Sequence, residues 1–126
     1  MANYPTETGY QPLYAGASRG ATAPTAAEVY AQGRTGLRLD VNVSAITGTS
    51  VTFTLQAYDP MTQTWFTLLA SAAVVAASRI ALFVDPRIAT AANASAQQVL
   101  PNRMRLSVTH TTITAVTYSA VATLSY

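Results

Sequence analysis

The chain has 126 residues, half of which are hydrophobic, with seven basic and five acidic side chains and a formal net charge of +2 at pH 7. This length fits a single domain. All the basic residues are arginines scattered along the chain, which argues against nucleic-acid binding, and the lack of cysteine excludes disulfides and thiolate metal sites. No signal peptide is expected, because the first residues lack a basic region followed by an apolar core. The longest apolar run is too short for a membrane span.

The low fraction of charged residues indicates what kind of surface the protein has. Only 10% of the residues are charged, whereas a typical domain has about 25%. Thr, Ser and Ala supply the small and polar surface instead. A surface of this kind suits a protein that works in contact with other protein, because a freely soluble monomer usually carries more charge.

Residues 1–35 differ in composition from the rest of the chain. They are rich in Gly, Pro, Ala and Thr, and the prolines fix the backbone and remove hydrogen-bond donors. A disordered tail is usually poor in aromatic residues, but this segment carries Tyr4, Tyr10, Tyr14 and Tyr30. We therefore predict an extended N-terminal arm whose tyrosines bind a partner, since a tyrosine ring buries a large area while its hydroxyl stays polar. The alternative is a mobile tail without a binding role.

One local element is predicted within this arm. Thr25 and Glu28 have the spacing of a helix capping box, and Gly33 follows where the cap at the end of a helix is expected. These signals predict a short helix near residues 26–32.

The stretch from Gly36 to Tyr58 carries the clearest strand pattern. Apolar residues alternate with polar ones in two runs, before and after the Thr-Gly-Thr sequence at 47–49. Alternation with period two gives a strand one apolar and one polar face. Because a Gly-containing turn between two such runs is typical of a hairpin, we predict a β-hairpin here.

Two further strands are expected after this hairpin. A Pro-containing turn at 59–63 precedes a strand at 64–69, and an alternating run at 79–84 predicts the second strand. The small residues at 68–77 have no clear period. This segment is open to three interpretations: a tightly packed strand, a bulged crossing or a helix.

A long connection leads to the C-terminal strands. Within it, residues 95–98 have the spacing of a capping box and predict one helical turn. Alternating runs then predict strands at 103–109 and 116–126, separated by a turn at 110–112.

Together these elements predict an all-β fold. Short strands separated by turns, with no long helix, are typical of a β-sandwich, and the long connection fits a crossing between two sheets. We predict that residues 36–126 form an antiparallel β-sandwich, of jelly-roll or immunoglobulin-like Greek-key type, with residues 1–35 as its arm. The alternation predicts that Phe53 and Leu106 are buried in the core. The residues that follow them, Thr54 and Ser107, should not be buried.

No catalytic, cofactor-binding or metal-binding residues are predicted. His110 is the only histidine and falls in an expected turn, where a histidine is usually solvated. Asp59 and Asp85 precede prolines in turns, which their own side-chain hydrogen bonds explain. Asp40 lies beside Arg38 and is expected to pair with an arginine on a neighbouring strand. Since phosphate-binding loops and nucleophile elbows are also absent, we expect the chain not to be an enzyme and to use no cofactor or metal.

Two groups of residues are candidates for a binding surface. Arg103 and Arg105 share one strand face, which Arg38 could join, but a few arginines on a sheet face more often serve an interface or solvent than a nucleic acid. Tyr58 and Trp65 could stack on a carbohydrate. Packing in the core or in an interface is the preferred explanation for Trp65.

Over residues 37–126 the sequence resembles small structural proteins of tailed bacteriophages. The likeness is carried by LRLDVNVSAITGTSVTFTLQAYDPMTQTWFTLL and by the later VLPNRMRLSVTH and VTYSAVATL. Proteins of this kind show a similar order of an LDV strand, a GTS turn, an LQA-x-DP strand end, a Trp-containing strand, a VLP-x-x-x-R-x-x-VTH strand and a TYS strand. These motifs are structural, so the resemblance supplies no catalytic or ligand-binding residues.

The resemblance implies a component of the virion, with a head decoration or cement protein as the first assignment. Such a protein binds the lattice of the major capsid protein on the outer surface of the head and stabilises it, after assembly in the host cytoplasm. The analogy also implies a homo-oligomer, with a trimer at local three-fold axes, and no nucleic-acid or membrane partner. The alternatives are a tail or neck component and a carbohydrate-binding or adhesion module displayed on the particle.

The arm has an expected role in such an assembly. Many weak contacts multiply when copies sit at fixed positions on a lattice, so the arm is expected to fasten the domain to the capsid. A chain that starts near Gly36 should then keep its fold and bind capsids more weakly.

Overall fold

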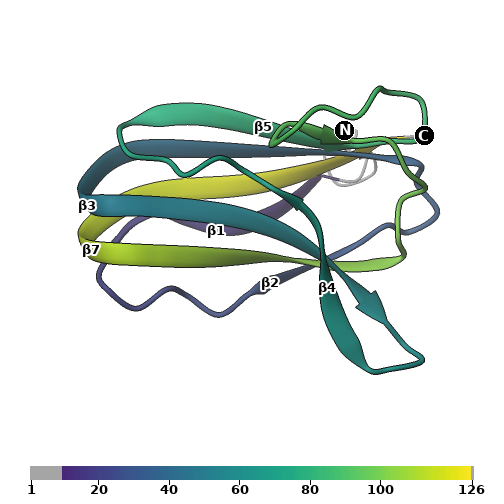
Figure 1. Ribbon diagram of the computed structural model, residues 1–126, viewed down its shortest axis with the longest axis horizontal. Helices are drawn as coiled ribbons and strands as arrows, with labels where there is room; N and C mark the ends of the chain where they lie inside the picture. Colours follow the sequence, from purple (N-terminus) through teal and green to yellow (C-terminus); the bar gives the residue numbers. More distant parts are fainter. Residues whose placement is uncertain (1–9, 126) are drawn as a thin grey trace, which may run out of the picture.

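The computed structural model describes residues 10–125, and within them every regular element is a strand. The strands are β1 (Tyr10–Arg19), β2 (Ala27–Tyr30), β3 (Gly36–Asp59), β4 (Thr64–Ala70), β5 (Ser78–Val84), β6 (Ser95–Ala96) and β7 (Arg103–Ser125). They form one sheet in the order β1-β7-β3-β5-β6, with β2 also paired to β7 and β4 to β3 (Figure 1). The all-β prediction is confirmed. The pairing of β5 with β6 is parallel, so the sheet is mixed rather than purely antiparallel.

The two long strands β3 and β7 form the centre of the sheet. They pair antiparallel from Gly36 opposite Ser125 to Ala57 opposite Met104. The hairpin predicted for Gly36 to Tyr58 is therefore wrong, because both of its runs belong to one continuous strand. The apolar residues have odd numbers in both runs, so they stay on one face when the strand continues through 47–49.

A shared bend takes the place of the two predicted turns at 47–49 and 110–112. Gly48 lies opposite Ile113, with a register shift beside it, and Gly48 and Thr112 have φ angles of 138° and 49°. A Cβ atom on Gly48 would collide with the carbonyl oxygen of Thr112, so the bend requires glycine here. Figure 1 shows both strands curving over at the same end, which lays the two halves of the sheet face to face.

The core lies between these two halves. Phe53, in the second half of β3, packs edge-on against Tyr118 of β7 with ring centroids 5.1 Å apart. Phe53 and Leu106 are fully buried, as predicted, while Thr54 and Ser107 are only partly covered. The alternation in the sequence thus identified the correct face of each strand even though the turns were misassigned.

The segment before Gly36 belongs to the sheet over its described part. β1 pairs with the C-terminal half of β7, and β2 pairs with the N-terminal half. The short helix predicted near residues 26–32 is wrong, because β2 occupies this place. Val29 is buried between the exposed Glu28 and Tyr30, and this period-two pattern outweighs the capping-box spacing. The predicted boundary between an arm at 1–35 and a domain at 36–126 does not coincide with the start of the sheet.

The remaining elements extend the sheet on the side of β3. The predicted turn at 59–63 is confirmed, with Asp59 Oδ1 accepting a hydrogen bond of 2.9 Å from the backbone N–H of Met61. The β3–β4 hairpin that it closes projects from the body of the molecule (Figure 1). Residues 71–77 form a loop that bridges to β3 through Val74, and β6 replaces the helical turn predicted at 95–98.

Candidate functional site

His110 lies inside the long strand β7, opposite Val51, and not in a turn as predicted. Its Nδ1 is 2.8 Å from the carbonyl oxygen of Gly20, and its Nε2 is 3.0 Å from the hydroxyl of Tyr118. Because a carbonyl oxygen can only accept, Nδ1 donates and Nε2 of the neutral ring accepts from Tyr118. The histidine therefore ties the segment after β1 to β7, and within residues 10–125 its ring makes no hydrogen bond to a carboxylate or a serine.

Arg19, at the end of β1, also contacts Tyr118 and so belongs to the same cluster as His110. It donates hydrogen bonds of 2.7–2.9 Å to the carbonyl oxygens of Ala15, Ala17 and Tyr118, and its guanidinium lies 4.3 Å from the centre of the Tyr118 ring. The Tyr14 ring packs edge-on against Tyr118 at 6.1 Å. These contacts with carbonyls and rings hold the N-terminal segment on the sheet, and they give the cluster a structural role.

The buried hydroxyl of Tyr118 leads to a prediction about alkaline stability. Loss of solvation on burial raises the pKa of Tyr118 to about 12 from its ordinary value of 10.0, although the charge of Arg19 lowers it. Between these two values the unfolded chain loses the proton before the folded chain does, so stability should fall as the pH rises from 10.0 to about 12. Urea unfolding at several alkaline pH values should show this loss. Tyr118→Phe should show a smaller loss, and an equal loss in both proteins would contradict the assignment to Tyr118.

A second group of side chains lies on the outer face of the sheet formed by β2, β7, β3 and β4. We call it the aromatic–arginine face, and it consists of Glu28, Tyr30, Gln56, Tyr58, Trp65, Arg103 and Arg105. The strand register creates it, because Tyr30 lies opposite Arg103 and Tyr58 lies opposite Trp65. Arg105 stands between Glu28 of β2 and Gln56 of β3. Side chains from four strands therefore meet on one surface.

Guanidinium groups lie over the aromatic rings of this face. Arg103 is 4.4 Å from the centre of the Tyr58 ring and 5.2 Å from that of Trp65, and Arg105 is 4.4 Å from Trp65. The rings of Tyr58 and Trp65 themselves are 5.0 Å apart and tilted. Attraction between a cation and a ring contributes roughly 0.5–1 kcal/mol at exposed sites. The stacked planar groups thus restrain one another and form a preordered surface.

Glu28 is engaged by two neighbours on this face. Arg103 donates to both of its carboxylate oxygens, at 3.0 and 3.4 Å, and the Tyr30 hydroxyl donates to Oε1 at 2.6 Å. The hydrogen bond from Arg103, followed by the one from Tyr30, holds the pKa of the Glu28 carboxyl below its usual value. Glu28 therefore stays ionised and forms an ion pair with Arg103.

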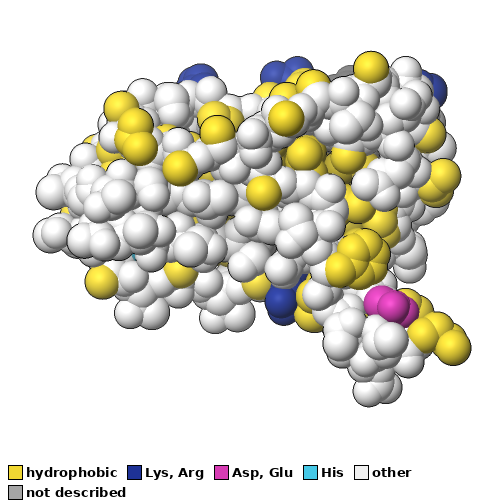
Figure 2. Space-filling model, viewed as in Figure 1, with side chains coloured by type: hydrophobic (Ala, Val, Ile, Leu, Met, Phe, Trp, Pro, Cys, Tyr) yellow, Lys and Arg dark blue, Asp and Glu magenta, His cyan; other side chains and the backbone are white. Residues whose placement is uncertain are grey.

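The projecting β3–β4 hairpin adjoins this face and carries exposed apolar side chains, of which Phe66 lies opposite Ala57 and so on the other side of the sheet from Trp65. Met61 at its tip is 90% exposed, and Phe66 of β4 is 50% exposed. Figure 2 shows hydrophobic side chains gathered along the projecting hairpin. Large exposed apolar groups beside aromatic residues are typical of a protein-binding surface.

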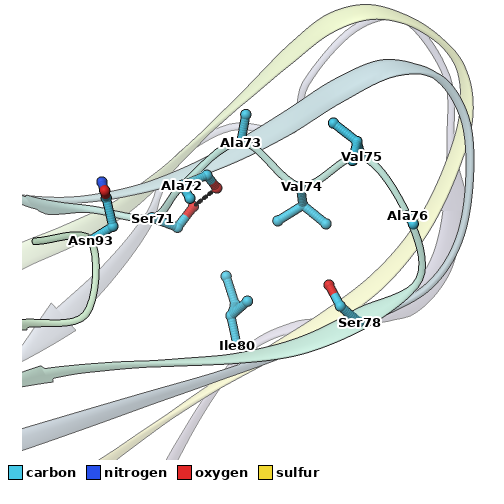
Figure 3. Close-up of a pocket in the computed structure, with 9 residues that line it drawn as sticks. All are labelled: Ser71, Ala72, Ala73, Val74, Val75, Ala76, Ser78, Ile80 and Asn93. Atoms are coloured by element: carbon cyan, nitrogen blue, oxygen red, sulfur yellow. Dashed lines mark hydrogen bonds between the residues drawn. The ribbon is translucent and has the colours of Figure 1, made fainter.

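A shallow apolar hollow lies elsewhere, between the loop at 71–77 and β5. It has a volume of about 340 Å³, and Val74, Val75 and Ile80 contribute to its lining (Figure 3). Its polar groups are Ser71, Ser78 and Asn93, and Ser71 Oγ donates a hydrogen bond to the carbonyl oxygen of Ala72. None of these lining residues is charged, so the hollow offers a ligand apolar contact and a few neutral polar groups.

The structure separates the four tyrosines that were predicted to bind a partner. Tyr4 and the side chain of Tyr10 lie outside the described residues. Tyr14 is engaged within the fold, since its hydroxyl is 2.8 Å from the carbonyl oxygen of Thr25 and its ring packs on Tyr118. Of the two tyrosines whose side chains the structure describes, Tyr30 is the exposed one, at 44%, and lies on the aromatic–arginine face, while the role predicted for Tyr4 and Tyr10 stays a prediction.

The other candidate residues divide in a similar way. Arg103, Arg105, Tyr58 and Trp65 come together, but Arg38 does not join them. It lies over the ring of Phe83 and pairs with Asp40 at 3.0 Å, a partner on its own strand rather than on a neighbouring one. The turn roles of the other two aspartates are confirmed, since Asp59 and Asp85 accept backbone hydrogen bonds within their turns.

A comparison of this chain with models of known protein families, with curated proteins and with solved structures found no match. Among residues 10–125, no helix has the length and apolar character of a membrane span. Within the same residues, no three His, Asp or Glu side chains are grouped so that they could hold a metal ion.

Proposed function

We propose that this chain is a non-enzymatic structural protein of a tailed-phage virion, and first of all a decoration protein of the outer capsid. The resemblance carried by the LDV, LQA-x-DP and VLP-x-x-x-R-x-x-VTH motifs supports this proposal. The folded-over sheet supports its structural part, namely that the chain is a variant of the β-sandwich of such proteins. The proposal includes a homo-oligomer, with a trimer at local three-fold axes, on the lattice of the major capsid protein.

The observation that carries the proposal is the aromatic–arginine face. Trp, Tyr and Arg are the residue types that contribute most to binding in protein interfaces, and Tyr30, Tyr58, Trp65, Arg103 and Arg105 meet on it. The exposed hairpin beside the face adds apolar area. A surface of this composition, on a chain with few charges, favours a protein partner.

The same geometry weighs against the carbohydrate-binding alternative. A sugar ring stacks on an open aromatic face, but guanidinium groups lie over the rings of both Tyr58 and Trp65. A neutral sugar would have to displace these stacked cations. A tail or neck position uses the same kind of protein contact as a head position, so only the place and number of copies distinguish the two.

Binding to purified heads tests the proposal. Heads that lack this protein are mixed with it, sedimented, and analysed for bound copies by quantitative mass spectrometry. Many copies per head and a higher temperature of head disruption are the expected result, because each bound copy adds contacts between capsid subunits. Few copies confined to the tail would assign the chain to the tail or neck. No binding to particles, together with binding of the free protein to glycans, would contradict the proposal.

A further inference from the structure

Arg105 makes no ion pair with any carboxylate among residues 10–125. Its Nε donates a hydrogen bond of 2.6 Å to Oε1 of Gln56, and its guanidinium lies over Trp65. Its two terminal nitrogens make no hydrogen bond to the part of the chain that the structure describes, and no ion pair reaches it from those residues. Arginine carries its charge at any ordinary pH and presents a planar fork that matches a carboxylate.

The neighbouring carboxylate of Glu28 makes its hydrogen bonds to other residues, although the charge of Arg105 also helps to lower its pKa. Glu28 lies opposite Arg105 in the register of β2 and β7, but both of its oxygens are bound by Arg103 and one also by Tyr30. Two arginines against one glutamate leave the face with an excess of positive charge. A partner with negative charge is therefore electrostatically complementary to this face.

We propose that Arg105 is the receptor for a carboxylate of a partner protein, and that the aromatic–arginine face binds an acidic segment of that partner. Gln56 and Trp65 hold the guanidinium in place, which lowers the entropy cost of binding. Met61 at the tip of the bordering hairpin is 90% exposed and offers an apolar contact to the same segment, and apolar contacts suit a polypeptide better than an acidic polysaccharide. This inference goes beyond the proposed function, because it assigns a binding chemistry whatever particle carries the protein.

Trp65 provides the measurement. It is the only tryptophan of the chain and lies against Arg105, so its fluorescence reports on this face alone. The full-length protein is titrated at low salt with a short oligoglutamate peptide, with an oligoglutamine peptide of equal length as the neutral control. The expected result is a saturable change in Trp65 fluorescence with oligoglutamate only, which weakens as salt is added.

Matched variants assign the binding to Arg105. Arg105→Gln should weaken oligoglutamate binding at least about tenfold, as expected for the loss of hydrogen bonds to a charged group. Arg38→Gln is the control, because Arg38 also lies over an aromatic ring on a strand but is already paired with Asp40. The affinity of this variant for oligoglutamate should equal that of the native protein. Gln56→Glu keeps Arg105 and supplies a carboxylate from within the chain, which should compete with the peptide and lower its affinity to a similar degree.

Four results would overturn the proposal. The native protein could show no response to oligoglutamate. Arg38→Gln could weaken binding as much as Arg105→Gln, which would show that the overall positive charge of the protein, and not Arg105, attracts the peptide. A response to an acidic oligosaccharide such as oligogalacturonate, with none to oligoglutamate, would assign the face to carbohydrate. If Arg105→Gln fails to fold, Gln56→Glu gives the decisive comparison, and unchanged affinity in that variant would refute the role of Arg105.

Discussion

A chain that begins at Gly36 is expected to lose its cooperative fold. The deletion removes β1 and β2, which cover one edge of β7 over both of its halves. It also removes the buried Val29 and Ala31 from the core, and the Tyr14 and Arg19 contacts with Tyr118. A small domain has a net stability of only about 5–15 kcal/mol, and the loss of two strands with their buried side chains exceeds what this margin tolerates.

Circular dichroism during heating measures this effect. The full chain should melt in one cooperative transition, and the chain that begins at Gly36 should show none. A chain that begins at Tyr10 is the matched control, because it keeps every strand that the structure describes, and it should melt like the full chain. A cooperative transition for the Gly36 chain at nearly the same temperature would restore the interpretation of residues 1–35 as a separate arm.

The alternation of apolar residues predicted most of the strands and the core. It placed Phe53 and Leu106 inside and indicated the strands around Trp65, Leu82 and Tyr118. Period two is a local property of the backbone, so it can be read without knowledge of the partner strand. The turn at Asp59 was equally predictable, because a local hydrogen bond to its own backbone stabilises it.

The bend at Gly48 was misread because its local signal is the same as that of a hairpin turn. Glycine with a positive φ serves both, and only the pairing distinguishes them. In a hairpin the two runs would pair with each other, whereas here both pair with β7, from 47 residues away (Ala57 to Met104) to 89 residues away (Gly36 to Ser125) in sequence. Such long-range pairing depends on competition among all the strands, which no local pattern encodes.

The helix predicted near residues 26–32 was wrong for a related reason. The signals at Thr25, Glu28 and Gly33 favour a helix by propensity, which is a weak preference that tertiary contacts routinely override. The single buried Val29 between two exposed residues was the better signal, but a run this short is ambiguous alone.

The candidate site was predictable only in part. The turn at Asp59 fixes the hairpin register, so the pairing of Tyr58 with Trp65 could have been deduced from the sequence. Arg103 and Arg105 were correctly assigned to one strand face. Their meeting with the two rings, and the presence of Glu28 and Tyr30, depend on β7 lying between β2 and β3, which the sequence does not reveal.

The largest effect of a single substitution is expected for Phe53→Ala. Phe53 is fully buried, and its ring meets the edge of Tyr118 across the core. Its backbone bonds to Ser71, of 3.1 Å to Oγ and 2.8 Å from the Ser71 N–H, do not involve the ring and remain available in the variant. The loss therefore measures the ring and the cavity that it leaves, which cost about 3–5 kcal/mol for a core aromatic residue.

Urea unfolding of the full chain measures this loss against a matched control. Phe66→Ala removes the same ring from the half-exposed face of β4, so its effect on the free energy of unfolding should stay within about 0.5 kcal/mol. The contrast between the two variants follows from the burial of each ring, since Phe53 is fully buried, Phe66 is 50% exposed and both substitutions remove the same atoms. A loss below about 1 kcal/mol for Phe53→Ala would mean that this ring does not fill the core, and a one-residue shift in the register of β3 is the change that would move it to the outer face.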